Sequence, residues 1–186
     1  HKYRDEANVC MTYLGDGAVN QGQVYESFNM AALWDLPVLF VIENNQYGMG
    51  TAVTRAAAGR SLAERGAAYG IPGRQVDGMD VLAVRKAGAE ALEHCRTGKG
   101  PYILEMKTYR YRGHSMSDPA KYRTREEVDA MRKQHDPIDQ IREVLQKQNV
   151  TEDRLKDIDA DVKAIVLRAT EFAQTSPEPD PSELFT

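Results

Sequence analysis

The chain has 186 residues, of which 24 are lysine or arginine and 28 are aspartate or glutamate, so its formal net charge is −4. Hydrophobic residues make up 41% of the sequence and charged residues 28%. This composition supports a packed core and excludes collagen-like, mucin-like and wholly disordered chains. Every apolar run is shorter than the ~20 residues that cross a bilayer, so we expect no membrane-spanning segment.

The first third of the chain has the pattern of a strand, a helix and a second strand. Apolar runs over 9–14 and 38–42 are continuous rather than alternating, which is typical of parallel strands covered on both faces. Between them, apolar residues recur at near-helical spacing from residue 24 to residue 33. We therefore predict a βαβ unit.

The pattern continues beyond two glycine-rich turns, at 48–50 and 70–73. Apolar residues at helical spacing predict a helix over 81–95, and the run from Tyr102 to Tyr109 predicts a third strand. The fold class expected from these elements is α/β, a parallel sheet flanked by helices. The aperiodic segment 110–123 then leaves the carboxyl end of a strand, where open α/β sheets bind ligands.

The remainder of the chain is predicted to be helical. Thr124 and Glu127 have the spacing of a capping box, and Pro137 is suited to the first turn of another helix. Apolar residues at steps of three and four over 155–172 predict an amphipathic helix whose apolar stripe needs a partner. We therefore divide one domain into a sheet-containing part, 1–123, and a helical C-terminal region, 124–186.

The two cysteines, Cys10 and Cys95, belong to no CxxC motif and to no histidine cluster. The sequence predicts two small buried thiols, with neither a disulfide nor a zinc site, and this favours a reducing compartment. The chain begins at His1 without a targeting pattern. We interpret it as a fragment of a longer protein.

The segment 107–125 is basic within an acidic protein, with Asp118 as its one acidic residue. Its basic residues are Lys107, Arg110, Arg112, Lys121, Arg123 and Arg125. This pattern indicates a confined anionic ligand or an acidic partner, although charge alone fits a solvated loop equally well. Nucleic-acid binding is disfavoured by the net charge of −4.

Two oxygen-rich turns carry the chemistry of the sequence. The motif Gly-Asp-Gly at 15–17 ends the first strand, and Asn-Asn at 44–45 ends the second. Asp16 offers a carboxylate, Asn45 a carboxamide and Tyr47 a main-chain carbonyl, which are ligands that Mg²⁺ accepts together with phosphate oxygens. Gly17 and Ala18 leave room for a diphosphate near a helix start.

Each motif has a simpler interpretation on its own, since Gly-Asp-Gly is a common tight turn and Asn-Asn commonly opens a loop. The combination, with strands before both and a helix between, favours a cofactor site. Competing phosphate motifs fit poorly. Val53 replaces the third glycine of a GxGxxG pattern that begins at Gly48, and the segment 98–100 lacks the spacing and hydroxyl of a P-loop.

Gly-Asp-Gly followed by Asn-Asn at this spacing is the thiamine diphosphate motif. The stretches GDGAVNQGQVYESFNMAALWDLPVLFVIENNQYGMGT and TYRYRGHSMSDPAKYRTREE resemble the alpha subunits of heterotetrameric, thiamine diphosphate-dependent 2-oxo acid dehydrogenases, most closely those that act on pyruvate. The similarity runs from Val9 to the end and covers about the C-terminal half of such a subunit. It implies the thiamine diphosphate-binding fold, with thiamine diphosphate and Mg²⁺ as cofactors.

The resemblance also implies an activity and partners. The family decarboxylates a 2-oxo acid, here pyruvate, and transfers the acetyl group to the lipoyl arm of dihydrolipoamide acetyltransferase. A beta subunit completes the heterotetramer and holds the aminopyrimidine of the cofactor. Position by position, the resemblance assigns the metal to Asp16, Asn45 and the Tyr47 carbonyl, and the diphosphate to Gly17 and Ala18.

Two loop residues are assigned in the same way. His114 matches the histidine of the active-site loop of the family, which reaches the cofactor and assists acetyl transfer to the lipoyl group. Ser115 matches a regulatory phosphoserine of mitochondrial enzymes, but a second phosphorylatable serine is absent, and Arg112 replaces a familiar histidine. We therefore expect an enzyme of the bacterial cytoplasm, with the mitochondrial matrix as the alternative, and a structural role for Ser115 through local hydrogen bonds.

Other functions remain open at this point. Branched-chain 2-oxo acid dehydrogenases and acetoin dehydrogenases share the same cofactor anchor, although the sequence HSMSDP favours pyruvate. The chain could also be a non-catalytic assembly module whose terminal helices serve oligomerisation.

Overall fold

The computed structural model describes residues 1–59 and 61–185. The chain forms two compact units, His1–Pro137 and Ile138–Thr186, and each is described by itself. The functional division after residue 123 stays a prediction.

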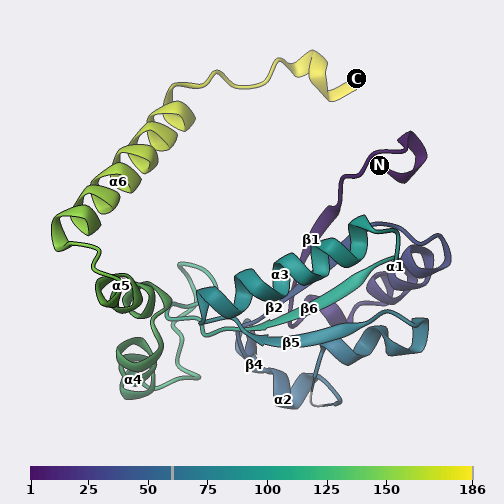
Figure 1. The fold of residues 1–186 in the computed structure, drawn as a ribbon, viewed down its shortest axis with the longest axis horizontal. Helices are drawn as coiled ribbons and strands as arrows, with labels where there is room; N and C mark the ends of the chain where they lie inside the picture. The colour runs from purple at the N-terminus through teal and green to yellow at the C-terminus, as the bar shows by residue number, and fades with distance from the viewer. Residues whose placement is uncertain (60, 186) are drawn as a thin grey trace. The chain divides into compact units, whose positions relative to one another are not determined.

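A four-stranded parallel sheet forms the centre of the first unit (Figure 1). Its strands, in the spatial order β1-β2-β6-β5, are β1 (Cys10–Gly15), β2 (Val38–Asn44), β6 (Tyr102–Lys107) and β5 (Gly73–Asp77). Because all four are parallel, their carboxyl ends meet at one edge of the sheet. The predicted α/β fold class is confirmed.

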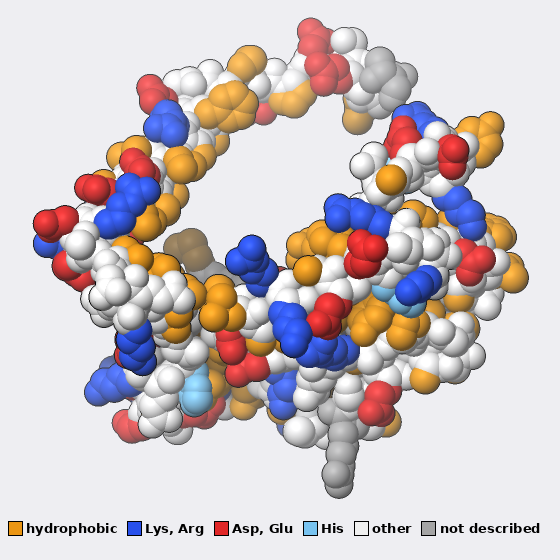
Figure 2. All heavy atoms as spheres, in the orientation of Figure 1, with side chains coloured by type: hydrophobic (Ala, Val, Ile, Leu, Met, Phe, Trp, Pro, Cys, Tyr) orange, Lys and Arg blue, Asp and Glu red, His pale blue; other side chains and the backbone are white. Residues whose placement is uncertain are grey.

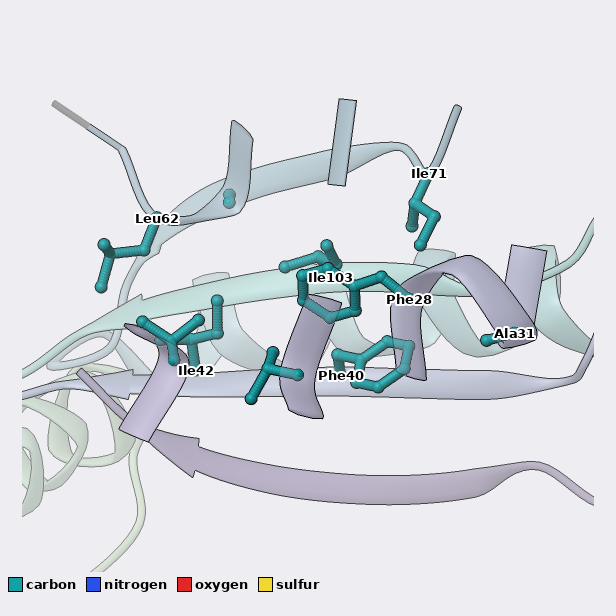
Figure 3. Close-up of a cluster of buried hydrophobic side chains, with 10 residues drawn as sticks. Phe28, Ala31, Phe40, Ile42, Leu62, Ile71 and Ile103 are labelled. Atoms are coloured by element: carbon teal, nitrogen blue, oxygen red, sulfur yellow. The ribbon is translucent and has the colours of Figure 1, made fainter. Parts of the chain in front are cut away.

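Helices cover both faces of this sheet. The helix α1 (Gly22–Leu33) and the 3₁₀ helix η3 (Ala63–Tyr69) pack on one face, and α3 (Val81–Arg96) packs on the other (Figure 1). Figure 3 shows the first core, in which Phe28 of α1 meets Phe40 of β2 edge to face, with ring centroids 4.8 Å apart. Ile42 and Ile103 lie in the same cluster. Successive residues of β2 and β6 point to opposite cores, which explains their continuous apolar runs.

The edge strand β1 departs from the prediction. Met11 is 44% exposed and Tyr13 59% exposed, because α3 packs over β6, β5 and β2 and leaves this face of β1 open. The predicted burial of Cys10 is wrong, since this cysteine is exposed, whereas Cys95 on α3 is buried as predicted. Neither cysteine forms a disulfide.

The strand β5 was not predicted. Its sequence, Gly-Arg-Gln-Val-Asp, contains one apolar residue, Val76, which is also its one buried residue. An isolated apolar residue gives no periodic signal, so only the tertiary fold reveals the strand. Gly73 is required there because a Cβ would lie 2.0 Å from the Ala63 carbonyl oxygen of η3.

Shorter elements connect the sheet to the helices. The three-residue 3₁₀ helices are η1 (Lys2–Arg4) and η2 (Ala18–Asn20), and the hairpin β3 (Tyr47–Gly48) and β4 (Thr51–Ala52) precedes the single turn α2 (Val53–Ala56). The helix α4 (Arg125–His135) begins where the capping motif predicts. The Thr124 hydroxyl accepts a hydrogen bond from the Glu127 backbone nitrogen at 3.1 Å.

The second unit contains α5 (Pro137–Lys147) from its second residue onward, α6 (Glu152–Thr175) and the 3₁₀ helix η4 (Pro181–Phe185). Arg142 of α5 donates to the Asp159 carboxylate of α6 at 2.9 Å. Hydrophobic side chains line α6 (Figure 2), where Ile158 is 40% exposed and Phe172 75% exposed. None of the helices in the described residues is long and apolar enough to cross a membrane.

Candidate functional site

The two oxygen-rich turns meet at the carboxyl edge of the sheet. Gly15, the last residue of β1, pairs in register with Glu43 of β2, so the turns that follow these neighbouring strands emerge side by side. Gly17 and Gly48 are in close contact, because a Cβ on Gly48 would lie 3.3 Å from the Gly17 Cα. It would also lie 3.7 Å from Asp16 Oδ2. The convergence predicted from the motif spacing is thus present.

The contact is tight from the side of Gly48, where a Cβ at 3.3 Å from the Gly17 Cα would force the two turns slightly apart. At Gly17 the φ of −73° is open to any residue, and a Cβ there would lie 3.5 Å from the Gly48 Cα, an ordinary van der Waals distance. The helix start predicted near Gly17 and Ala18 is present as a short 3₁₀ turn, with the α-helix beginning further along. These residues cap and begin the three-residue η2, and α1 starts only at Gly22. A dipole of α1 therefore cannot act directly at Ala18.

Asp16 is a buried carboxylate at the centre of the site, with only 3% of its surface exposed. Burial raises its pKa, and this is partly offset by hydrogen bonds from the backbone of Asp16 and Asn45 and by the charge of Arg110. A buried carboxylate whose charged form is disfavoured gains from a bound cation. The backbone contact also fixes Asp16 beside Asn45.

The Asn45 carboxamide lies between Tyr47 and Arg110. One end is 2.9 Å from the Tyr47 carbonyl oxygen, and the other is 3.0 Å from Arg110 Nη2. With its nitrogen toward Tyr47, Asn45 donates to the carbonyl and accepts from Arg110. With its oxygen toward Tyr47, it accepts a longer hydrogen bond, 3.3 Å, from the Tyr47 backbone nitrogen and lies beside the carbonyl oxygen.

The second orientation fits a bound metal ion. Two oxygens at right angles on Mg²⁺, each at about 2.1 Å, are about 3.0 Å apart, close to the spacing of the Asn45 carboxamide and the Tyr47 carbonyl. Within residues 1–59 and 61–185, no three His, Cys, Asp or Glu side chains gather as a metal cluster. The donor set is therefore one carboxylate with neutral oxygens, which suits Mg²⁺ shared with phosphate better than Zn²⁺.

A buried hydrogen-bond network supports the turn that carries Asn45 and Tyr47, and it was not predicted from the sequence. Glu105 of β6 is fully buried and accepts a hydrogen bond from Asn44 Nδ2 at 2.7 Å. Asn44 Oδ1 in turn accepts from the Gln46 backbone nitrogen at 3.1 Å, which stabilises the positive φ of 75° at Gln46. The signal in the sequence that could have revealed this network is a glutamate in the middle of an otherwise apolar strand.

Burial alone would raise the pKa of Glu105, yet the hydrogen bonds that it accepts outweigh burial and lower it. Besides Asn44 and Gln75, its donors come from one segment. They are the Ser61 hydroxyl at 2.8 Å and the backbone nitrogens of Leu62 at 2.8 Å and Ala63 at 3.2 Å. Glu105 thus stays ionised in the core and joins η3 to the site.

The loop 110–123 is organised around Asp118. Its carboxylate accepts from the His114 backbone nitrogen at 2.7 Å, from the Ala120 backbone nitrogen at 2.8 Å and from the Tyr122 hydroxyl at 2.8 Å. These bonds lower the pKa of Asp118, with that from His114 contributing most. The His114 side chain is exposed, and its Nδ1 lies 3.4 Å from Arg110 Nη1. Arg110 therefore connects His114 to the Asp16 cluster.

A buried arginine anchors the end of this loop. Arg123 is 8% exposed and lies over the rings of Tyr109, Tyr122 and Tyr47, at 5.2, 5.1 and 5.6 Å from their centroids. Burial raises the pKa of Tyr109 to about 12, helped by its hydrogen bond to Glu127. Because Tyr47 belongs to the same turn as Asn45, this cluster packs the loop against the candidate site.

Ser115 forms the local hydrogen bond expected of it, with its hydroxyl 3.0 Å from that of Ser117. The side chain is exposed.

A parallel α/β sheet whose carboxyl edge combines a buried carboxylate, a carboxamide and a close glycine contact has the arrangement with which open α/β proteins bind small ligands. The family described as "Dehydrogenase E1 component" matches residues 1–182, and the chain belongs to that family.

Curated proteins support this assignment. The chain is 62% identical to the pyruvate dehydrogenase E1 component subunit alpha of Rhizobium meliloti (strain 1021), over 100% of this chain and 54% of that protein. It is 56% identical to the subunit of the same name in Zymomonas mobilis, over 100% and 52%. It is 52% identical to the mitochondrial form of Dictyostelium discoideum, over 100% and 49%. The chain thus spans about half the length of the curated relatives it matches.

Proposed function

We propose that this chain supplies the diphosphate and magnesium side of a thiamine diphosphate-dependent pyruvate dehydrogenase, as part of its alpha subunit. The observation that carries the proposal is the convergence of Asp16, Asn45 and the Tyr47 carbonyl at the sheet edge, beside the contact between Gly17 and Gly48. The names of its relatives, from bacteria and from mitochondria, support the same activity.

In this proposal the Asp16 carboxylate, the Asn45 carboxamide oxygen and the Tyr47 carbonyl hold Mg²⁺. Gly17 and Ala18 contact the diphosphate, since no side chain at position 17 blocks its approach. Thiamine diphosphate, when bound, supplies the carbanion-stabilising chemistry of 2-oxo acid decarboxylation. The protein fixes the anchor of the cofactor and excludes water from it.

The partners follow from the same proposal. A beta subunit would complete the cofactor site in a heterotetramer, and the lipoyl domain of dihydrolipoamide acetyltransferase would receive the acetyl group. The basic segment 107–125 would attract an acidic lipoyl domain. We place the enzyme in the bacterial cytoplasm, with the mitochondrial matrix as the alternative.

The substrate is tested by comparing pyruvate, 2-oxoisovalerate and acetoin as substrates of the intact alpha subunit assembled with its beta subunit, thiamine diphosphate and Mg²⁺. We expect kcat/KM to be at least about tenfold higher for pyruvate than for 2-oxoisovalerate, since even one extra methylene in a pocket changes it by about 10 to 200-fold. Acetoin lacks the carboxylate of a 2-oxo acid and should also be a poorer substrate. Preference for 2-oxoisovalerate or acetoin would reassign the substrate. Absence of any turnover in the assembled enzyme would favour an assembly module, which the exposed apolar side chains of α6 also suit.

His114 offers a second test, since an imidazole on the loop can donate a hydrogen bond or move a proton near neutral pH. We expect His114→Ala to leave cofactor binding and decarboxylation largely unchanged and to slow acetyl transfer to a lipoyl domain by about 100-fold, the lower range for loss of an acid–base group. His135→Ala removes another exposed histidine of the first unit and serves as the control. An equal loss of both half-reactions in His114→Ala would contradict this role.

A further inference from the structure

Arg110 places a positive charge among the oxygen atoms of the candidate metal site. Its Nη2 lies 3.0 Å from the Asn45 carboxamide, and its charge acts on the buried Asp16 carboxylate. The two side chains that we assign to the metal therefore already interact with a cation of the chain itself. Neither the family description nor the names of the relatives assign any role to this arginine.

The Asn45 carboxamide cannot serve Arg110 and a metal ion beside Tyr47 together, because Arg110 and Tyr47 face opposite ends of the carboxamide and it has only one oxygen. When Oδ1 faces Arg110, it accepts from the guanidinium, and Nδ2 donates to the Tyr47 carbonyl, so both oxygens needed by the metal are occupied. When Oδ1 faces Tyr47, as metal binding requires, Nδ2 faces the guanidinium, donor against donor. Such an arrangement is unfavourable in a partly buried site, and Arg110 has to move.

We propose that Arg110 is an internal cation of this site, which holds Asn45 and balances Asp16 when the metal is absent and which a divalent metal displaces on binding. The proposal rests on the magnesium site of the proposed function. Since the two cations compete for the same oxygens, each lowers the affinity of the site for the other.

The displacement would also reach the active-site loop. Arg110 is the first residue of the loop 110–123, and its Nη1 lies 3.4 Å from His114 Nδ1. Release of Arg110 from Asn45 therefore frees the loop at the end that carries this contact, while Arg123 still holds the other end against Tyr47. Arg110 is thus a positioning residue that couples metal binding to the placement of His114.

The test measures Mn²⁺ alone, without a diphosphate, binding to the intact protein by the loss of the free-ion signal in electron paramagnetic resonance. Arg110→Met removes the guanidinium and retains an apolar side chain of similar length. We expect it to bind Mn²⁺ about tenfold more tightly than the wild type, within the usual range of coupling between sites. Arg112→Met is the matched control, since it removes one positive charge from an exposed side chain two positions further along the same loop. We expect its affinity to stay within about twofold of the wild type.

Hydrogen exchange of the loop 110–123 distinguishes competition from simple charge repulsion. In the wild type, saturating Mn²⁺ should speed exchange in this loop by releasing Arg110. In Arg110→Met, exchange should already be fast without metal and should not change when Mn²⁺ is added. Any of three results would overturn the proposal. The Mn²⁺ affinity could be unchanged or weaker in Arg110→Met, it could rise equally in Arg112→Met, or the hydrogen exchange of the wild-type loop could stay the same when Mn²⁺ is added.

Failure of the magnesium site itself gives a different result. If the wild type binds no Mn²⁺ at millimolar concentrations, both the metal assignment and the competition are wrong. If the wild type binds Mn²⁺ and Asp16→Asn abolishes this binding, the metal site stands, and only the comparison between Arg110→Met and the wild type decides the role of Arg110.

Discussion

Replacing Asp16 with asparagine is expected to abolish magnesium-dependent binding of thiamine diphosphate by the intact protein. Asparagine keeps the shape of the side chain and removes its charge, and Asp16 is the one carboxylate of the proposed donor set. We expect the affinity for thiamine diphosphate, measured by calorimetry in the presence of Mg²⁺, to fall by about 100-fold or more. Replacing a residue that only hydrogen-bonds to a metal ligand already costs about 10 to 100-fold in affinity.

Asp16→Asn should lose the ligand without losing the fold. Burial raises the pKa of Asp16, so the folded protein disfavours the charged carboxylate relative to a neutral group. The metal-free variant should therefore keep the thermal midpoint of the metal-free wild type within a few degrees. If Asp16→Asn keeps this thermal midpoint and loses cofactor binding, the loss results from the change at the site and not from unfolding.

Glu43→Gln is the matched control for this experiment. Glu43 is exposed and pairs in register with Gly15, but its side chain borders the hollow on the α3 face, together with Met11 and Tyr13. The substitution Glu43→Gln removes one negative charge from the same edge of the sheet, as Asp16→Asn does, but away from the proposed metal ligands. Calorimetric binding that is unchanged in Asp16→Asn, or equally weakened in Glu43→Gln, would exclude Asp16 as a metal ligand.

The sequence was sufficient to place the two turns of the site together. The runs that became β2 and β6 are continuous because both faces of these strands are covered, and parallel strands bring their carboxyl ends to one edge. Asp16 follows β1 and Asn45 follows β2, and because these two strands pair in parallel, both residues lie at that edge. Thr124 likewise marked the start of α4, because capping depends on neighbouring residues alone.

The features that were missed depend on contacts between distant segments. Met11 and Tyr13 are exposed because α3 does not extend over β1, and no local pattern encodes the reach of a helix. The contact of Arg110 with Asn45 arises where an aperiodic loop returns to the sheet edge. The periodicity of apolar residues predicts helices and strands, whereas the residue that a loop side chain contacts depends on the whole fold.

Glu105 shows how such a long-range contact supports the site, and its replacement should have the largest effect on stability. In Glu105→Gln, an amino group replaces one carboxylate oxygen, and it must face either Asn44 Nδ2 or the three donors of residues 61–63, all of which already donate to Glu105. Hydrogen bonds to a buried charge are worth about 1.5 to 3 kcal/mol each, and stranded donors add their desolvation cost. We expect the free energy of unfolding, measured by urea denaturation of the intact protein at pH 7, to fall by about 3 kcal/mol.

Ser61→Ala provides a graded comparison, because it removes one donor and keeps the charge. It should cost about 1.5 kcal/mol, the lower end of the range for a hydrogen bond to a charged group. A loss in Glu105→Gln no larger than that in Ser61→Ala would show that the carboxylate is not the centre of the network.

The pH dependence of the same variant tests the charge itself. Since the net effect of the native environment is to lower the pKa of Glu105, the folded state binds a proton at this group less readily than the unfolded state does. The stabilisation is therefore complete above the ordinary glutamate pKa of about 4.3 and is lost as the pH falls through the lower folded value. The difference in stability between wild type and Glu105→Gln should be constant from pH 7 to pH 6 and shrink below pH 4, because glutamine does not titrate. A difference that instead grows as the pH falls from 7 toward about 4.3 would mean that Glu105 is protonated in the native core, and the turn that carries Asn45 and Tyr47 would then rest on neutral hydrogen bonds alone.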